Sequence, residues 1–100
     1  MPNHNYESGR RQEYQVRNKW RELGYMVLRT AGSHGPFDLV AIHPQRDEIL
    51  LIQVKRVGGP KDAERVIAKF KKDPPLSPML HKQVIEVYVK KTRERITSWI

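Results

Sequence analysis

An acid and a Gln-x-Lys triplet occur in neighbouring hydrophobic segments of this chain, as Asp38 and then Gln53 and Lys55. Side chains of a β-strand alternate between its two faces, so Gln53 and Lys55 share a face with Ile49 and Leu51. Burying an amide without a partner costs roughly 2 kcal/mol, and burying an unpaired ammonium costs far more. Polar side chains on a strand face that the apolar pattern predicts to be buried therefore indicate a functional site.

A third oxygen donor comes from Glu13, in a predicted helix where it shares the apolar side with Val16. Carboxylate and amide oxygens from Glu13, Asp38 and Gln53 would suit Mg²⁺. Hydrolysis of a phosphodiester needs a metal to activate water and polarise the phosphoryl oxygen, with a cation near the developing charge. Lys55 would orient or deprotonate the water. These residue types predict metal-dependent phosphodiester hydrolysis.

Composition restricts the class of protein. The 100 residues, 38% of them apolar, predict a single domain over residues 1–100. A net charge of +8, from 19 Lys and Arg against 11 Asp and Glu, favours a polyanionic partner such as nucleic acid. The absence of cysteine excludes disulfides and thiolate zinc sites, so any metal would be held by oxygen or imidazole.

Nothing in the sequence predicts a membrane protein. No segment approaches the roughly 18 consecutive apolar residues of a membrane span. The first residues, Met1–Asn5, lack the apolar core of a signal peptide. We therefore expect a cytoplasmic, DNA-associated protein.

The first predicted element is a helix over residues 9–23. Ser8 is its expected N-cap and Gly24 its C-cap. Its expected apolar stripe consists of Val16, Trp20 and Leu23. Glu13 would then lie on the side of the helix that faces the rest of the domain.

Strands and one further helix follow. The patterns predict strands over residues 25–29, 37–42, 48–55 and 83–89, and a helix over residues 60–72. The short turn at residues 43–47 favours an antiparallel hairpin, which would bring Asp38 near Gln53. The tail, residues 93–100, fits either an edge strand or a short helix. The order α-β-β-β-α-β predicts an α/β fold with a mixed sheet flanked by helices.

The order Glu13, Asp38, Gln53 and Lys55 on this framework resembles the PD-(D/E)XK nuclease superfamily. Within it, the sequence is most similar to archaeal-type Holliday junction resolvases. The matching segments are Glu13–Tyr25, Val27–Arg29, a Gly/Ser-rich loop and Phe37–Ala41. The resemblance covers residues 9–57 well and the remainder only by topology.

This resemblance implies a restriction-endonuclease-like fold and a homodimer that cuts four-way DNA junctions symmetrically. It implies Mg²⁺ as the cofactor, with Mn²⁺ as a substitute. It also assigns roles to residues. Glu13, Asp38 and Gln53 would bind the metal. Lys55 would act on the attacking water, and Arg29 and Ser33 would assist at the phosphate.

Two positions depart from the family pattern. Phe37 replaces the proline of the motif and leaves the following acid in place. Gln53 replaces the second acid, and a neutral carbonyl attracts a cation less strongly than a carboxylate does, so metal affinity should fall. We interpret the change as tuning of the site.

Each site residue also has an ordinary structural interpretation. Glu13 could be a solvated carboxylate paired with Arg10 or Arg17, Asp38 a turn residue, and Lys55 a surface residue at a strand end. The functional alternatives are another branched-DNA or nicking endonuclease of the same superfamily, or a DNA-binding module whose site has decayed. A basic membrane-surface or RNA-binding protein is a third, disfavoured alternative.

Contacts to DNA and to a second copy are expected beyond the site. The candidate DNA-binding residues are Arg10, Arg11, Arg29, Ser33, His34, Arg56, Lys61, Lys69 and Lys72. The candidate dimer seam consists of late apolar residues, namely Phe70, Leu76, Met79, Leu80, Trp99 and Ile100. Phe70 has the alternative role of sealing the second helix to the sheet.

Overall fold

The structure is a computed structural model that describes residues 4–30, 36–75 and 82–100, with side chains described from Arg10 onward. Its elements, in chain order, are α1 (His4–Glu22), β1 (Met26–Arg29), β2 (Leu39–His43), β3 (Glu48–Val57), α2 (Pro60–Lys72), β4 (Lys82–Val89) and β5 (Glu94–Trp99). The tail therefore forms a strand, the first of the two predicted alternatives. No helix in the described residues is long and apolar enough to cross a membrane.

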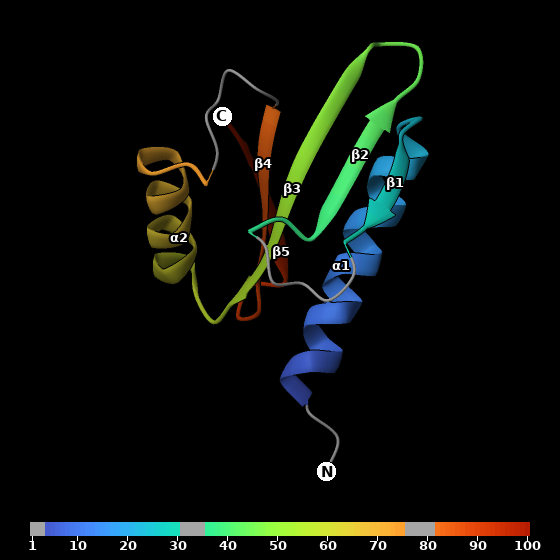
Figure 1. Ribbon diagram of the computed structural model, residues 1–100. Coiled ribbons are helices and arrows are strands. Elements are labelled where there is room, and N and C mark those ends of the chain that lie inside the picture. The colour runs from blue at the N-terminus through green and yellow to red at the C-terminus, as the bar shows by residue number, and fades with distance from the viewer. Residues whose placement is uncertain (1–3, 31–35, 76–81) are drawn as a thin grey trace.

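The described strands form one five-stranded sheet in the order β1-β2-β3-β4-β5. β3 and β4 run parallel and are connected through α2, and the other neighbouring pairs are antiparallel. Figure 1 shows the sheet between the two helices. The predicted α/β class with a mixed sheet is confirmed, as is the antiparallel hairpin of β2 and β3.

α1 packs on one face of the sheet through Val16 and Trp20, which contact buried side chains of β1 to β4. Leu23 was predicted to belong to this stripe, but it is 55% exposed. The reason is that α1 ends at Glu22 and the chain turns away at Gly24, whose φ of 95° is easily adopted by glycine alone.

The predicted start of the first helix is wrong. α1 begins at His4 and runs through Ser8 and Gly9, so Ser8 is not an N-cap. A glycine inside a helix costs only about 1 kcal/mol relative to alanine, which is too little to stop a helix that its neighbours continue.

α2 packs on the opposite face, where Ala63 and Phe70 contact Ile85, Val87 and Val89 of β4. The predicted bounds of this helix are confirmed, with Pro60 in its first turn, where a missing amide hydrogen costs nothing. Two apolar clusters, one on each face, therefore hold the helices to the sheet.

The predicted dimer seam requires correction. Phe70 is only 4% exposed because it seals α2 to the sheet, so it is not available to a second copy. Ile100 packs against the same cluster, whereas Trp99 remains 44% exposed. Leu76, Met79 and Leu80 lie outside the described residues.

The face of β3 that is buried in the core is not the one that was predicted. Its side chains alternate as expected, but the fully buried ones are Leu50 and Ile52, which face α1. Ile49, on the face of Gln53 and Lys55, is 37% exposed. Gln53 and Lys55 therefore do not lie in the main core. They lie on the face that α2 covers, where polar side chains can reach solvent.

Candidate functional site

Asp38 is anchored against β3 by hydrogen bonds on both sides of Gln53. Its backbone amide donates to the Ile52 carbonyl at 2.9 Å, and its carboxylate Oδ2 accepts from the Val54 amide at 2.8 Å. The Thr30 amide, just after β1, donates to the Asp38 carbonyl at 3.0 Å. These bonds fix a carboxylate beside the Gln-x-Lys triplet at the point where β2 begins.

Gln53 and Lys55 line a hollow of about 270 Å³ between β3 and α2, together with Lys69 and Asp73 from the α2 end. Val66, Phe70 and Pro75 supply its apolar part. In the part of the chain that the structure describes, neither Gln53 nor Lys55 makes a side-chain hydrogen bond. The amide and the ammonium are thus both available to a ligand.

Glu13 is paired with Arg29 rather than with Arg10 or Arg17. The Arg29 Nε donates to the Glu13 Oε1 at 3.1 Å, and the Glu13 side chain is 16% exposed. Because Arg29 ends β1 and the next residue, Thr30, donates to the Asp38 carbonyl, this pair adjoins the β2 start. The predicted residues therefore form two groups on opposite faces of the sheet. Glu13 and Arg29 lie on the face that α1 covers, and Gln53 and Lys55 lie on the face that α2 covers, with Asp38 anchored to the same segment of β3.

The oxygen donors of these groups are of the kind that Mg²⁺ prefers. The Asp38 carboxylate and the Gln53 carbonyl come from adjacent, hydrogen-bonded segments, and Glu13 offers a second carboxylate. Among the described residues, no three His, Cys, Asp or Glu side chains cluster as a metal site. A donor set with only two carboxylates and one amide fits an oxygen-seeking ion of modest affinity.

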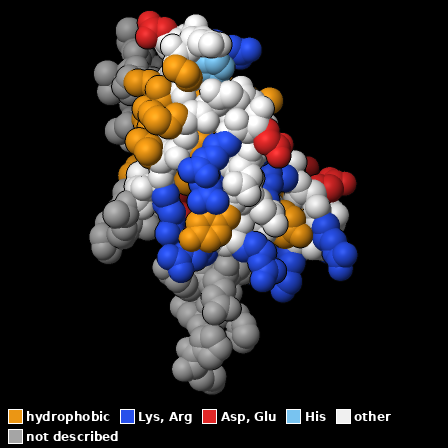
Figure 2. Space-filling view, turned by 90° about the vertical axis from the view of Figure 1, so that its right-hand side faces the viewer, with side chains coloured by type: hydrophobic (Ala, Val, Ile, Leu, Met, Phe, Trp, Pro, Cys, Tyr) orange, Lys and Arg blue, Asp and Glu red, His pale blue; other side chains and the backbone are white. Residues whose placement is uncertain are grey.

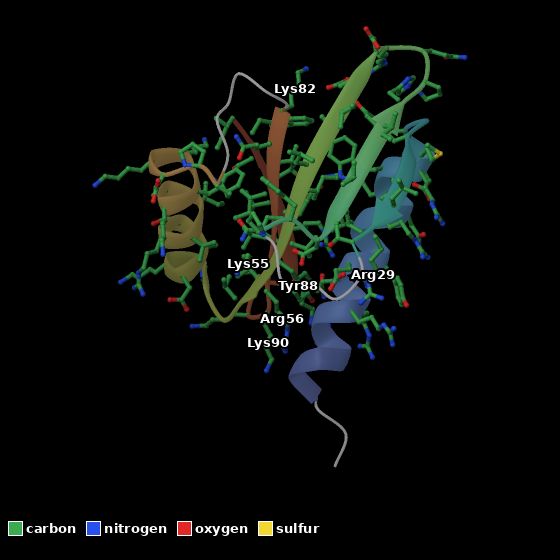
Figure 3. All side chains as sticks on the ribbon, in the orientation of Figure 1. Arg29, Lys55, Arg56, Lys82, Tyr88 and Lys90 are labelled. Atoms are coloured by element: carbon green, nitrogen blue, oxygen red, sulfur yellow. The ribbon has the colours of Figure 1, made fainter. Side chains whose placement is uncertain are left out.

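Basic side chains surround this end of the sheet. Figure 3 shows Arg29, Lys55, Arg56 and Lys90 toward one end of the molecule, with Lys82 at the other. Figure 2 shows Lys and Arg side chains gathered on the side that carries α1 and β1. Of the predicted DNA-binding residues, all of those with described side chains except the half-buried Arg56 are exposed, namely Arg10, Arg11, Arg29, Lys61, Lys69 and Lys72. Ser33 and His34 lie outside the described residues.

An arginine cluster on α1 and β1 was not predicted as a unit. The guanidinium carbons of Arg17, Arg10 and Arg29 lie 4.7, 5.9 and 5.9 Å from the ring centroid of Tyr14, within cation–π range. The helical spacing of Arg10, Tyr14 and Arg17 was the available signal, since residues three or four apart are neighbours on a helix surface.

A buried carboxylate, Glu86 of β4, was also missed. It is fully buried and accepts hydrogen bonds from Lys19 Nζ at 2.8 Å, Trp20 Nε1 at 2.9 Å and the Thr97 hydroxyl. The signal was an acid within the apolar segment 84–89. Because all three donors come from neighbouring elements, Glu86 ties α1 to β4 and β5.

Comparison with known proteins identifies a structural relative. No protein-family model matches the chain, and no curated protein matches it by sequence. Hjc, a Holliday junction resolvase from the hyperthermophilic archaeon Archaeoglobus fulgidus, is similar in structure with a TM-score of 0.58 and 18% sequence identity. The match covers 93% of this chain and 71% of the resolvase. The chain therefore has the fold of that resolvase, as the sequence predicted.

Proposed function

We propose that this protein is a metal-dependent endonuclease that cleaves branched DNA, with the four-way junction as its substrate. The observation that carries the proposal is the hydrogen bond from the Val54 amide to the Asp38 carboxylate. It holds an acid against the segment of β3 that carries Gln53 and Lys55, on a fold similar to that of a junction resolvase. Those three groups are the parts that metal-assisted phosphodiester hydrolysis requires.

Asp38 and Gln53 would hold Mg²⁺, or Mn²⁺ in its place. Glu13 would join them by sharing its carboxylate between the ion and the Arg29 guanidinium, with which it is now paired. When bound, the ion would lower the pKa of a water molecule and polarise the phosphoryl oxygen. The protein residues would fix the position of the ion relative to the scissile bond.

Lys55 would hold the attacking water. Its exposed ammonium projects from the same face of β3 as Gln53 and lines the same hollow. An ammonium there can donate hydrogen bonds to a water or to a phosphate oxygen, and its charge opposes the negative charge that develops during attack. Arg29, oriented by Glu13, would contact the phosphate from the other side.

The net charge and the basic side chains at this end of the sheet support contact with the DNA backbone. Symmetric cleavage of a four-way junction needs two strand cuts, which a twofold homodimer would make with two identical sites. Sedimentation velocity with and without a junction would test the homodimer. A monomer in both states would leave an endonuclease that makes single nicks.

One observation favours a second candidate function. Gln53 stands where the resembled family has an acid, so the chain could be a DNA-binding module that no longer cleaves. Retention of Glu13, Asp38 and Lys55 argues against this, since the loss of cleavage would remove the reason to keep them. Another branched-DNA or nicking endonuclease is the alternative within catalysis.

The test is cleavage of end-labelled four-way, flap and linear duplex DNA with Mg²⁺ or Mn²⁺, beside Asp38→Asn as the matched control. Paired nicks across the four-way junction, absent with the control, would support the proposal. Equal cleavage of linear DNA would favour the alternative nuclease. Binding of the junction without cleavage at any concentration of either metal would identify the decayed module.

A further inference from the structure

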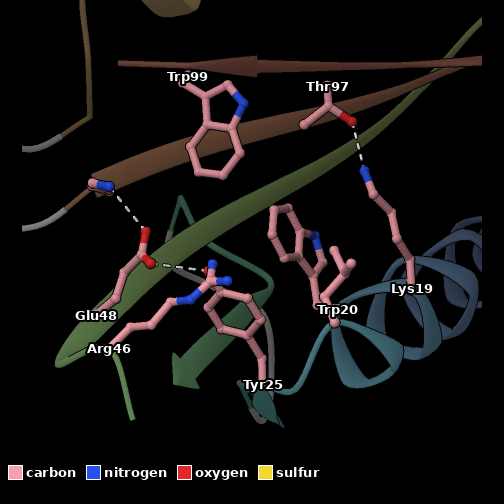
Figure 4. Close-up of a pocket in the computed structure, with 9 residues that line it drawn as sticks. Lys19, Trp20, Tyr25, Arg46, Glu48, Thr97 and Trp99 are labelled. Atoms are coloured by element: carbon pink, nitrogen blue, oxygen red, sulfur yellow. Dashed lines mark hydrogen bonds and ion pairs between the residues drawn. The ribbon is translucent and has the colours of Figure 1, made fainter. Parts of the chain in front are cut away.

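A second cavity, of about 570 Å³, lies on the face of the sheet that α1 covers. It opens between the end of α1, the start of β3, the start of β4 and the end of β5 (Figure 4). Glu48, which lines it, is separated from Gln53 by roughly 17 Å of strand at about 3.3 Å per residue. The two residues also project from opposite faces of β3, since Glu48 shares its face with Leu50 and Ile52. The cavity therefore lies apart from Gln53 and Lys55, and none of its lining residues belongs to the proposed nuclease site.

Aromatic rings form one wall of this cavity. Trp20 meets Tyr25 edge-on with centroids 5.2 Å apart, and it meets Trp99 edge-on at 5.5 Å. The Trp20 indole is fixed from behind, because its Nε1 donates to the buried Glu86 at 2.9 Å. Trp99 is 44% exposed, so part of its ring is open to a flat ligand. Figure 4 shows the rings of Trp20, Tyr25 and Trp99 facing the same space.

Besides the aromatic rings, Leu23, Thr97 and Glu48, three cations line the cavity. Lys19, Arg46 and Lys82 contribute positive charge, and they come from α1, from the β2–β3 turn and from β4. The nearby carboxylates are Glu48, which pairs with Lys82 at 3.0 Å, and the buried Glu86, which pairs with Lys19 at 2.8 Å. Three cations against two carboxylates leave the cavity net positive.

The ligand must satisfy both halves of this lining. A neutral apolar ligand would leave the cations unused, and an inorganic anion would leave the aromatic wall unused. A nucleotide combines a flat aromatic base with a phosphate, and aromatic stacking beside cationic side chains is how unpaired nucleotides are bound. The volume lies within the range of about 300 to 1,000 Å³ that is typical of small-molecule sites.

We infer that this cavity binds a nucleotide, with the base against Trp99 and the phosphate toward Arg46 and Lys82. The nucleotide could be free or could be an unpaired residue of a DNA strand, because both present the same base and phosphate. The Glu48 carboxylate, which already accepts a hydrogen bond from the Tyr25 hydroxyl at 3.0 Å, would accept from an N–H of the base or a sugar hydroxyl. The inference does not depend on the proposed nuclease activity.

Intrinsic fluorescence provides a direct measurement, because the chain has only two tryptophans and both line this cavity. The full chain would be titrated with dAMP, deoxyadenosine, inorganic phosphate and a short single-stranded oligonucleotide. Saturable quenching by dAMP, with at least tenfold weaker binding of deoxyadenosine and of phosphate, is expected. Tighter binding of the oligonucleotide than of dAMP would support the site and identify DNA as the source of the nucleotide.

Variants separate this site from the rest of the molecule. Arg46→Gln changes an exposed turn residue and should fold normally, and it should weaken dAMP binding about tenfold. Arg21→Gln, an exposed charge on the last turn of α1 that does not line the cavity, should bind as the native chain does. Asp38→Asn should also bind dAMP normally, even if it abolishes DNA cleavage, so failure of one proposal is distinguishable from failure of the other.

Three results would overturn the inference. The first is no quenching by dAMP or the oligonucleotide at millimolar concentration. The second is equal affinity for dAMP and for phosphate alone. The third is fluorescence that changes with protein concentration and not with nucleotide, which would show that a second copy of the chain covers Trp99 and fills the cavity.

Discussion

The Val54 amide donates a hydrogen bond of 2.8 Å to the Asp38 carboxylate, across the junction between β2 and β3. This bond has a structural role in the fold as well as a role in the candidate site. It satisfies a backbone donor at the end of a sheet ladder, and it sets the position of the acid relative to Gln53 and Lys55. Substitutions at Asp38 can therefore separate a structural effect from a chemical one.

Asp38→Asn and Asp38→Ala should differ in stability and agree in activity. The asparagine carbonyl can still accept from the Val54 amide, whereas alanine leaves that donor unpaired at a cost of about 1 kcal/mol. Neither variant supplies the negative charge that a metal ion requires. Urea unfolding would measure the stability difference, and junction cleavage should be lost in both. Cleavage by Asp38→Asn near the native rate would exclude Asp38 as a metal ligand.

Gln53→Glu should strengthen metal binding. A carboxylate in place of the amide adds a full negative charge to the ligand set, so the Mg²⁺ concentration for half-maximal cleavage should fall, by roughly tenfold if the added attraction is about 1.4 kcal/mol. The measurement is the cleavage rate of native and variant proteins across a Mg²⁺ titration. Gln53→Leu is the control, because it removes the oxygen ligand and should raise the requirement. Identical titrations for all three proteins would refute a role for Gln53.

Junction binding should depend strongly on salt. If about six basic side chains neutralise phosphates, a plot of log affinity against log salt should have a slope near −5, at about −0.9 for each contact. Arg10→Gln should make the slope less steep by about 0.9, because Arg10 belongs to the cluster around Tyr14. Arg21→Gln, an exposed α1 residue near the opposite end of the sheet, should leave the slope unchanged. A flat response of the native chain would remove DNA binding from the proposal.

The features predicted correctly from the sequence are those that depend on local pattern, such as the bounds of a helix and a hairpin. The bounds of α2 follow from Pro60 and from the spacing of Ala63 and Phe70, and the β2–β3 hairpin follows from a short polar turn between apolar segments. Burial could not be predicted from β3 alone, because both of its faces carry apolar residues. The choice of Leu50 and Ile52 for the core depends on where α1 lies.

Contacts between side chains that are far apart in the sequence could not be predicted from local pattern either. Glu13 was expected to have Arg10 or Arg17 as an alternative partner, since both are neighbours on the helix, but its partner is Arg29 from β1. Glu86 is acceptable in an apolar strand only because Lys19, Trp20 and Thr97 meet it from two other elements. Such partners are fixed by the packing of the helix on the sheet.

Glu86→Ala should be strongly destabilising. The substitution leaves the Trp20 Nε1 and the Thr97 hydroxyl without their acceptor, and it leaves the Lys19 ammonium without its counter-ion. Lys19 is 36% exposed and can turn to water, so the loss should be about 2 kcal/mol rather than the larger cost of stranding a fully buried charge. Urea unfolding would measure it. Glu94→Ala, exposed on the adjacent strand, should change stability by less than about 0.5 kcal/mol.

Stability should decline in acid partly through Glu48. The hydrogen bond from the Lys82 ammonium lowers the pKa of the Glu48 carboxyl, and the hydrogen bond from the Tyr25 hydroxyl lowers it further. A lowered pKa in the folded state means that the unfolded chain binds the proton more readily. The resulting stabilisation is present above the unfolded pKa, near 4.3, and is lost as pH falls through the folded pKa.

Glu48→Gln should therefore be less stable than the native chain at pH 7, by about 1 kcal/mol for an ion pair that is partly exposed. The difference should shrink toward zero as pH falls below 4, because the native carboxyl then becomes neutral too. Urea unfolding of both proteins between pH 7 and pH 3 measures it. Asp62→Asn is the control, since the ion pair of Asp62 with Arg65 is long, at 3.7 Å, and exposed. If the free energies of unfolding of the native chain and Glu48→Gln differ by the same amount over this pH range, the Glu48 charge does not stabilise the fold.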